Sequence, residues 1–596
     1  MPHKLLIGIG LLLLGSALTG LSVAEEIRIQ PSEDWEWDVD GIERLLPRWE
    51  TPEEREAYEG TALPRRRNDP PPLQPIRNVA EFDPMTGVLI RYPLGLPYDL
   101  LREMNEDVIL SVVVSSSSYN TARNNFQSQG IDPAEVDWIV AANNSIWTRD
   151  YGPWFVFDGA GDIAIINHTY NRPWRPDDND IPLECGAHWG IPVYSHDLWH
   201  TGGNYMTDGC GISFSTDLVW DENDHMGEQE IFALMQDYYG LSTYNVVPDI
   251  SNTGIHHIDT WAKLLDEETV IMKEVSSNHG DYPELEQNAT LISSLISSTG
   301  RNYEVVRVFC QPIPNGGVAS YTNCLILNDK VLVPTFDDAD DDEAALQAYR
   351  DAMPGYEVLG FSHSGWLTDD ALHCRAKGVA DREMLYVRHF PIVEWSTYGP
   401  IPIRALIDDR SEAGLKTDSL LVHWRAYPDG SPPPSFNATV LAPDEDPDWY
   451  VAAIPAQPSG TVVDYYVHAA DWSGRREGMP RTEPDAHYSF VVDWPTGVAD
   501  LPAREGAKLH PARPNPFFPA TTFSFELEHA DRVLLEVLDL QGRRIRTLVD
   551  GTVGAGRHEI TWSGRDEAGR EVSAGTYFYR LRAAGITYTR KAVLTK

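Results

Sequence analysis

Short apolar runs alternate with stretches of helical length between residues 76 and 392. Val108–Val114 is a run of mostly β-branched residues, which is typical of a buried strand. The pairs Asp158-Gly159 and Asn328-Asp329 separate apolar runs and predict hairpin turns. This alternation predicts a mixed α/β domain over residues 76–392. The predicted strands are Gly87–Ile90, Val108–Val114, Trp154–Phe157, Ile163–Ile166, Leu264–Met272, Cys324–Leu327 and Val331–Val333, and the predicted helices are Tyr98–Asn105, Glu228–Tyr239, Leu285–Ser298 and Glu343–Met353.

The pattern changes after His389-Phe390 to short alternating strands with turn residues between them. Leu420–Trp424, Trp449–Ala453 and Val462–His468 predict a β-sandwich of immunoglobulin type over residues 393–495. A linker over 496–510 then precedes a second all-β unit, over 511–596.

The sequence of the N-terminal region is not typical of a packed domain. Lys4, the apolar run Leu5–Leu14 and the small residues Ser22-Val23-Ala24 predict a secretory signal peptide over residues 1–24, with a retained membrane anchor as the alternative. Residues 25–75 are charged and rich in proline, which indicates a pro-segment or linker. Within it, Arg65-Arg66-Arg67 is either a processing site or an exposed charge run.

The formal net charge of −43 argues against nucleic acid or an anionic membrane as a partner. It favours either attraction of cationic substrates or simply a solvated acidic surface. In an oxidising compartment four of the five cysteines could pair and leave one thiol free, and Cys374 has His373 and Arg375 as direct neighbours. The alternative is that all five are small buried apolar residues.

Four distant stretches together carry a possible reaction centre. They contain Asp150, the pair His257 and Asp259, Asn323, and Cys374. Two carboxylates can grip the N–H edges of a guanidinium group, a thiolate can attack its central carbon, and a histidine can move protons. Each residue also has an ordinary structural explanation, such as a turn-capping aspartate or a local His–Asp pair.

Local patterns predict how these residues are presented. We expect Asp150 at the end of a strand, and His257 and Asp259 on one face of a strand with His256 facing the other way. The adjacent Gly202 and Gly203 permit close backbone approach to a ligand or form a simple bulge.

The order, types and spacing of these stretches, including Trp147-x-Arg149-Asp150-x-Gly152-Pro153, resemble the agmatine deiminase and bacterial, Porphyromonas-type peptidylarginine deiminase family. The resemblance runs from about Phe82 to His389 and implies the pentein fold, a five-bladed β/α-propeller. It implies that Cys374 is the nucleophile, His257 the general acid/base, and Asp150 and Asp259 the guanidinium ligands. Further implied roles are orientation by Asn323 and contact of Trp147 and Ile255 with the arginine stem.

One departure from the family concerns the substrate. Secreted members carry an Arg-Pro-Arg element for the α-carboxylate of a C-terminal arginine, and here Arg172 matches while Trp174 stands at the second arginine's place. Arg175 could substitute if the loop shifts by one residue. A preference for C-terminal arginine is therefore left open.

The last unit carries Pro514-Asn515-Pro516-Phe517-Phe518-Pro519 and Ser573-Ala574-Gly575-Thr576-Tyr577. It resembles the C-terminal sorting domains of type IX secretion and the immunoglobulin-like module of a flagellar hook-capping protein. The resemblance implies export across a bacterial outer membrane through that secretion machinery, so the protein is expected to be secreted or held at the cell surface. An adhesive β-sandwich is the alternative.

The sequence therefore predicts a secreted peptidyl-arginine deiminase that forms citrulline through a covalent thiouronium, with no metal or organic cofactor required. The alternatives are a small-molecule guanidine hydrolase of the agmatine type and an inactive surface-binding protein. The run Asp337–Asp342 is a candidate structural calcium site, or a cap on the following helix. No membrane span is expected in the mature chain.

Overall fold

The computed structural model describes residues 36–41, 44–58, 66–250, 255–313, 317–494, 507–515, 517–527, 529–538, 543–567, 569–570, 572–573, 575–583 and 586–595. The predicted signal peptide lies outside these residues, and so do parts of the predicted pro-segment and of the predicted linker over 496–510. Among the described helices, none combines the length and apolar character needed to span a membrane.

Five separate sheets build the first domain, and all follow one plan. In each, an antiparallel pair of strands is joined to a third strand that runs parallel to one of them. A helix precedes the parallel strand, as βαβ crossovers require. The strand orders are β19-β4-β5-β6, β3-β7-β8-β9, β10-β11-β12, β13-β14-β15 and β16-β17-β18.

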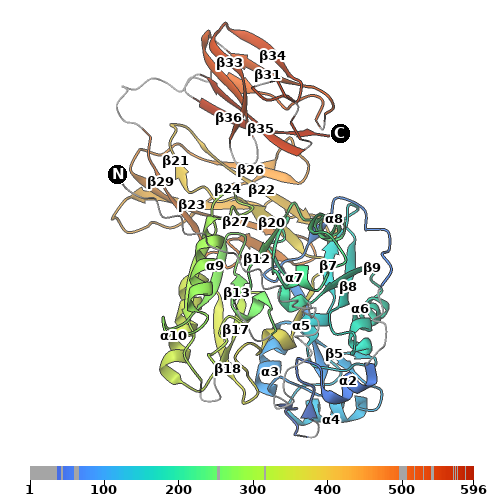
Figure 1. Cartoon of the computed structure of the whole chain (residues 1–596). Helices are drawn as coiled ribbons and strands as arrows, with labels where there is room; N and C mark the ends of the chain where they lie inside the picture. The colour runs from blue at the N-terminus through green and yellow to red at the C-terminus, as the bar shows by residue number, and fades with distance from the viewer. Residues whose placement is uncertain are drawn as a thin grey trace, which may run out of the picture.

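The strands are β3 (Arg77–Asn78), β4 (Met85–Tyr92), β5 (Ile109–Val114), β6 (Asp137–Val140), β7 (Trp154–Phe157), β8 (Ile163–Tyr170), β9 (Val193–His200), β10 (Met206–Thr207), β11 (Ile212–Thr216), β12 (Thr243–Val247), β13 (Ala262–Leu264), β14 (Thr269–Glu274), β15 (Glu304–Phe309), β16 (Leu325–Leu327), β17 (Lys330–Thr335), β18 (Glu357–Ser362) and β19 (Lys377–Ala380). The helices of eight residues or more are α3 (Tyr98–Asp107), α4 (Tyr119–Ser128), α6 (Pro176–Trp189), α8 (Glu228–Tyr239), α9 (Tyr282–Ser294) and α10 (Ala339–Ala352). These helices lie around the outside of the sheets (Figure 1).

The end of this domain returns to its beginning, because β19 pairs antiparallel with β4. The strands are short and mostly buried on both faces, as their nearly continuous apolar sequences predict. The last turn before β19 is thereby brought beside residues that precede it by almost 300 positions, and this places the candidate site.

The predicted mixed α/β class is confirmed, and most elements match within a few residues. Leu264–Met272 is the exception, because it is not one strand but the hairpin of β13 and β14. Asp266 makes the turn by accepting hydrogen bonds from the main-chain N–H groups of Glu268 and Thr269. The periodicity also failed to predict α4 and α6.

An all-β sandwich follows, with sheets β20-β22-β26-β25 and β21-β29-β27-β23-β24, and with β28 paired to β27. Its strands are β20 (Leu385–His389), β21 (Glu394–Trp395), β22 (Ile401–Asp409), β23 (Leu421–Pro428), β24 (Asn437–Val440), β25 (Ala442–Pro443), β26 (Trp449–Ile454), β27 (Thr461–Ala470), β28 (Arg476–Met479) and β29 (Tyr488–Val492). The sandwich starts before the predicted residue 393, because β20 is hydrogen-bonded to β22 along its length.

The last unit has its own buried core around Phe523, Trp562 and Tyr579. Its sheets are β30-β31-β34 and β33-β32-β35-β36. The strands are β30 (Ala507–Leu509), β31 (Thr521–Leu527), β32 (Asp531–Leu538), β33 (Arg544–Val553), β34 (Gly556–Trp562), β35 (Gly575–Ala583) and β36 (Ile586–Leu594). Figure 1 shows this unit (red) at the opposite side of the sandwich from the α/β domain.

Part of the predicted pro-segment is folded against the first domain. It forms β1 (Glu36–Trp37), β2 (Arg44–Leu45) and α2 (Pro52–Tyr58). Leu45 is buried in the same apolar cluster as Trp147 and Cys374. This segment is therefore packed onto the domain instead of trailing from it as a linker would.

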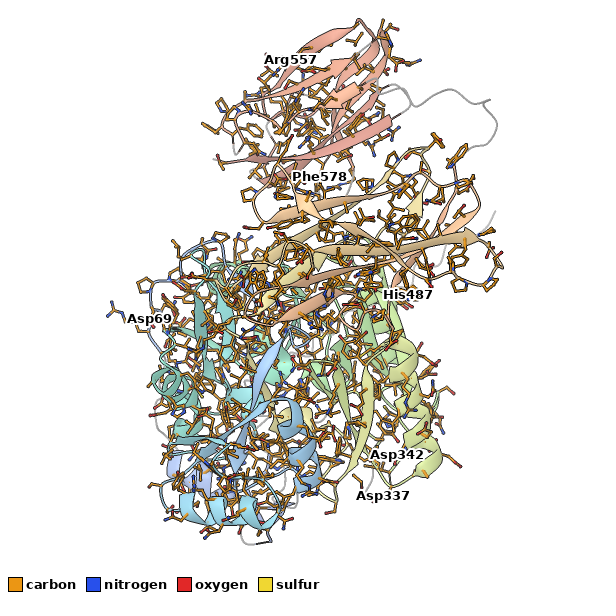
Figure 2. All side chains as sticks on the ribbon, turned by 180° about the vertical axis from the view of Figure 1, so that it is seen from behind. Asp69, Asp337, Asp342, His487, Arg557 and Phe578 are labelled. Atoms are coloured by element: carbon orange, nitrogen blue, oxygen red, sulfur yellow. The ribbon has the colours of Figure 1, made fainter. Side chains whose placement is uncertain are left out.

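No disulfide forms among the five cysteines, all of which are described; four are buried and Cys210 is partly exposed. In the acidic run, Asp338 accepts a hydrogen bond from the Asp341 N–H and caps α10. Asp342 accepts from Tyr321 Oη at 2.7 Å. Figure 2 places Asp337 and Asp342 at the end of the α/β domain away from the sandwich. The part of the chain that the structure describes holds no group of three or more His, Cys, Asp or Glu side chains arranged for a metal ion.

Candidate active site

Four single helical turns, each near a strand, carry or flank most of the candidate residues. They are α5 (Thr148–Tyr151) before β7, η1 (Gly202–Asn204) after β9, η2 (Ile258–Thr260) before β13, and η3 (His373–Arg375) before β19. α5 contacts both η1 and η3, and η1 contacts η2. Because β7 and β9 belong to one sheet, turns beside three different sheets therefore meet at one point.

Gly203 marks where the side chains converge. A methyl group at this position would lie 2.6 Å from His257 Nδ1, 2.7 Å from Asp150 Oδ1 and 3.2 Å from Asp259 Oδ1. Its own N–H donates to Asp150 Oδ1 at 3.2 Å. The double glycine thus allows close approach, as one of the two sequence readings proposed, but the groups approached are the site's own side chains.

The local geometry around His257 differs from the prediction. His257 and Asp259 do not lie on a strand: His257 has extended backbone and immediately precedes the turn η2. Asp150 sits within the turn α5 and not at a strand end. His256, with a φ of 61°, points elsewhere and pairs with Asp249 at 2.6 Å. The side chains of His256 and His257 do point in different directions, as predicted, but the reason is the local backbone and not the alternation of a strand.

Asn323 holds the Cys374 thiol in position through hydrogen bonds. Its Nδ2 donates to Cys374 Sγ at 3.3 Å and to the Asp259 carbonyl at 3.3 Å. Its Oδ1 accepts from the N–H groups of Ala371 and Cys374 at 3.0 and 3.3 Å. One amide therefore joins the nucleophile's turn to the turn that carries a carboxylate, and Cys374 Sγ lies 3.8 Å from Asp259 Oδ2.

The electrostatics of the closed site disfavour the charged form of Cys374, His257 and Asp150. Burial, then the charges of Asp259, Asp370 and Asp150, raises the pKa of the Cys374 thiol well above its ordinary value. Burial likewise lowers the pKa of His257 well below its usual range, so the ring is neutral. Burial, followed by the charge of Asp259, raises the pKa of Asp150 to about 7. A bound cation would reverse the first and third of these effects.

A buried network, not visible in the sequence, supports Asp259. His373 Nδ1 lies 2.6 Å from Asp259 Oδ2, and its Nε2 lies 2.6 Å from Glu81 Oε2. Glu81 in turn pairs with Arg149 at 2.9 Å and Lys263 at 2.7 Å. The motif that carries the resemblance contains Arg149, but no local signal could have connected it to Glu81.

Arg375 does not serve as a cation for the thiol. Its guanidinium pairs with Asp370 at 3.2 Å and donates to the carbonyls of Gly95 and Gly365 at 2.8 and 2.7 Å. It also lies over the ring of Trp147, 5.5 Å from the ring centre. The residue next to the cysteine is thus directed into the domain.

The other predicted contact residues lie buried around the same site. Trp147 and Ile255 are 3% and 4% exposed, and the Arg172 charge lowers the pKa of Asp150. The Trp174 ring lies 5.9 Å from the Arg172 guanidinium carbon. Arg175 is bonded within the chain, because its Nε pairs with Glu54 Oε1 at 2.9 Å.

Residues 98–377 match the sequence model of the family described as Porphyromonas-type peptidyl-arginine deiminase. This part of the chain is a deiminase domain of that family. Residues 515–585 match the FlgD Ig-like domain. The deiminase domain makes the protein an enzyme of the guanidine-hydrolysing class.

Agmatine deiminases are among the curated relatives of this chain. An agmatine deiminase of Ectopseudomonas mendocina is 24% identical over 298 residues, which cover 42% of this chain and 79% of that protein. One of Medicago truncatula is 24% identical over 320 residues, or 44% and 82% of the two chains. Among solved structures, the agmatine deiminase of Enterococcus faecalis is 21% identical, with a TM-score of 0.47, and covers 52% of this chain and 96% of its own.

Proposed function

We propose that the protein hydrolyses the guanidinium group of arginine in peptides or proteins to citrulline and ammonia. The observation that carries this proposal is the convergence of Asp150, His257 and Asp259 on Gly203, with Cys374 held beside Asp259 by Asn323. Two carboxylates, a neutral histidine and a thiol in one buried place are the groups that this reaction needs.

In the proposed binding step, Asp150 and Asp259 accept hydrogen bonds from the guanidinium N–H groups. The cation stabilises both carboxylates and favours loss of the thiol proton, because it offsets the negative charges that raise the pKa of Cys374. Deprotonation therefore accompanies substrate binding, and a reactive thiolate does not persist in the empty site.

In the proposed chemistry, His257 takes the thiol proton and Cys374 Sγ forms a bond to the guanidinium carbon. The carbon–nitrogen bond breaks as His257 returns that proton to the departing ammonia, which leaves a thiouronium. His257 then takes a proton from water, whose oxygen attacks the same carbon. The carbon–sulfur bond breaks, the sulfur takes the proton of the newly bound hydroxyl group, and citrulline is released. His257 then gives its proton to ammonia or to solvent water.

The charge of Arg172 supports the choice of peptide arginine over agmatine as the substrate. Arg172 is 2% exposed and its charge acts on both Asp150 and His257. A buried guanidinium repels the amino cation at the far end of agmatine, whereas it can donate to a carbonyl or carboxylate oxygen.

We further propose that the five sheets are the blades of a pentein propeller, which their shared plan and the pairing of β19 with β4 support. The C-terminal unit is proposed to direct type IX export, with the FlgD-like match as support for its immunoglobulin-like class alone. Calcium at Asp337–Asp342 remains a prediction.

The experiment measures ammonia release from a peptide ending in arginine, a peptide with internal arginine, and agmatine, with Cys374→Ala as the control. Activity on either peptide that disappears in Cys374→Ala is expected. Activity on agmatine alone would favour the small-molecule alternative, and no activity on any of the three would favour a binding protein.

A further inference from the structure

The candidate site is closed in this structure. Cys374 is 1% exposed, and His257 and Asn323 are 0% exposed. An enzyme that accepts a peptide needs access to its nucleophile, so the residues that cover the site are part of its function. Residues 45–50 of the N-terminal segment contact the site residues themselves.

The main chain of this segment is held by the residues predicted to contact substrate. Arg172 Nε donates to the Arg48 carbonyl at 3.1 Å. Arg175 Nη2 donates to the carbonyls of Pro47 and Trp49 at 2.6 and 3.0 Å. Three successive carbonyls, where the chain bends at Arg48 and Trp49, are therefore bound by two buried arginines.

The indole of Trp147 adds another contact, because its Nε1 donates to the Pro47 carbonyl at 3.3 Å. These donors recognise backbone oxygens and not particular side chains. They would serve equally for any peptide that passes through the same place.

The side chain at the centre of this peptide is itself an arginine. Arg48 is paired through its guanidinium with Asp369, and the side chain is 10% exposed. Its positive charge contributes to the lowered pKa of His257, and it lies close enough to Cys374 for the two side chains to interact electrostatically. A guanidinium group thus lies within electrostatic reach of the proposed nucleophile and acid/base.

Arg48 is nonetheless held unproductively. Its ion pair is with Asp369, while Asp259 Oδ1 and His257 Nε2 have no hydrogen-bond partner among the described residues, and His257 Nδ1 lies 3.4 Å from Asp150 Oδ1. The groups proposed to bind and process a guanidinium thus have buried polar atoms without a hydrogen-bond partner, which is costly unless a ligand supplies one.

The segment is anchored by the helix that follows. Glu54 and Thr51 form a capping box at the start of α2, with N–H to side-chain distances of 2.8 and 3.2 Å. The same Glu54 carboxylate pairs with Arg175. Beyond α2 the chain is next described at Arg66, which pairs with Asp180 on α6 at 3.1 Å.

We propose that Leu45–Glu50 is a substrate-like inhibitor built into the chain, and that the site it occupies binds a peptide with an internal arginine. The proposal rests on the proposed function and identifies its substrate class and regulation. Arg48 has a residue on each side within the site, so a chain that continues past its arginine fits there. Displacement of the segment, or cleavage near Arg65-Arg66-Arg67, opens the site.

The test compares the full chain with the variants Glu54→Ala and Arg48→Ala, and with Glu56→Ala as the matched control. Glu56 is exposed on the same helix, so this control removes a carboxylate without loosening the anchor. The rate of Cys374 alkylation by iodoacetamide is measured at each cysteine by mass spectrometry. Citrulline release from an internal-arginine peptide is measured in parallel.

We expect alkylation of Cys374 to rise at least tenfold in Glu54→Ala and Arg48→Ala and to stay unchanged in Glu56→Ala. Partly exposed Cys210 should react equally in all proteins, and buried Cys310 should stay unmodified, which rules out general unfolding. Peptide turnover should rise in the same two variants.

Two outcomes separate this inference from the proposed function. If Cys374 is already alkylated as fast as Cys210 in the unchanged chain, or reacts no faster in the two variants, the inhibitor is overturned, whether or not the enzyme is active. If Cys374 becomes accessible but no arginine or agmatine is converted, the segment does cover the site and the proposed reaction is wrong.

Discussion

Substitution of Gly203 by alanine tests the geometry of the site directly. The new methyl group would lie 2.6 Å from His257 Nδ1 and 2.7 Å from Asp150 Oδ1. Both distances are below 3.0 Å, which real Cβ atoms essentially never show. Since Gly203 has no positive φ, alanine can adopt its backbone conformation, and the strain falls on the two side chains.

The expected magnitude follows from the displacement. Ordinary contact begins at 3.4 Å, so His257 and Asp150 must each move by about 0.7–0.8 Å. A misplacement of about 1 Å can cost about 100-fold in rate, because the reacting groups leave their near-attack geometry. Overpacking of this kind costs about 1–3 kcal/mol of stability, which the large domain should tolerate.

The assay is kcat/KM for the most active substrate, together with thermal unfolding. Gly227→Ala is the matched control, because Gly227 has extended backbone at the start of α8 and a methyl group there would meet nothing within 4 Å. We expect about 100-fold lower kcat/KM for Gly203→Ala and no change for the control.

Wild-type kcat/KM in a folded Gly203→Ala protein would refute the reasoning. It would mean that His257 and Asp150 do not act from the positions they hold beside Gly203. Complete unfolding of the variant would be uninformative about catalysis, so the unfolding transition is recorded before any rate is compared.

Three further predictions concern the surroundings of the site. The pKa of Asp150 is about 7, so kcat/KM should fall as the pH drops below 7, and Asp150→Asn should lose this limb along with most activity. The pKa of Asp150 is higher in the folded protein than in the unfolded chain, so the stability present at a pH below the unfolded-chain pKa is lost as the pH rises through 7. Asp150→Asn removes this loss and should therefore raise the unfolding temperature more at pH 8 than at pH 4. His373→Ala removes the hydrogen bond to Asp259 and should lower kcat/KM by roughly tenfold. His373→Asn has an amide that can replace Nδ1, so it should recover part of the lost kcat/KM. Equal losses in the two variants would exclude positioning of Asp259 through that hydrogen bond. Arg481 is 11% exposed and joins the sandwich to Asp83 and Glu267 of the deiminase domain, so Arg481→Ala should cost about 3 kcal/mol in denaturant unfolding. Arg475→Ala, at a more exposed pair, should cost less than about 1 kcal/mol, and similar values for both would contradict the argument.

Local sequence was sufficient for the types of most elements. Trp154–Phe157 and Glu228–Tyr239 have the predicted bounds, because a strand or helix that buries apolar residues leaves its period in the sequence. The break inside Leu264–Met272 was missed, since it depends on the hydrogen bonds of Asp266 and not on a change in apolar pattern.

Sequence motifs identified the candidate residues, but they did not identify the neighbouring residues that hold them in place. Asp150, His257, Asp259, Asn323 and Cys374 were identified by residue type and resemblance, and the structure brings them together. The link through His373 to Glu81 spans 292 positions. No periodicity records a contact at that separation, because it is decided by which sheets pack together.

The sequence by itself determined the α/β and β regions and the chemistry that the chain can offer. Only the tertiary structure decided that α5, η1, η2 and η3 meet, that Gly203 sets their spacing, and that Arg48 reaches Asp369 across 321 positions. The physical reason is that side-chain patterns reflect burial and local turns, whereas an active site depends on distances between elements, which exist only once the sheets have packed.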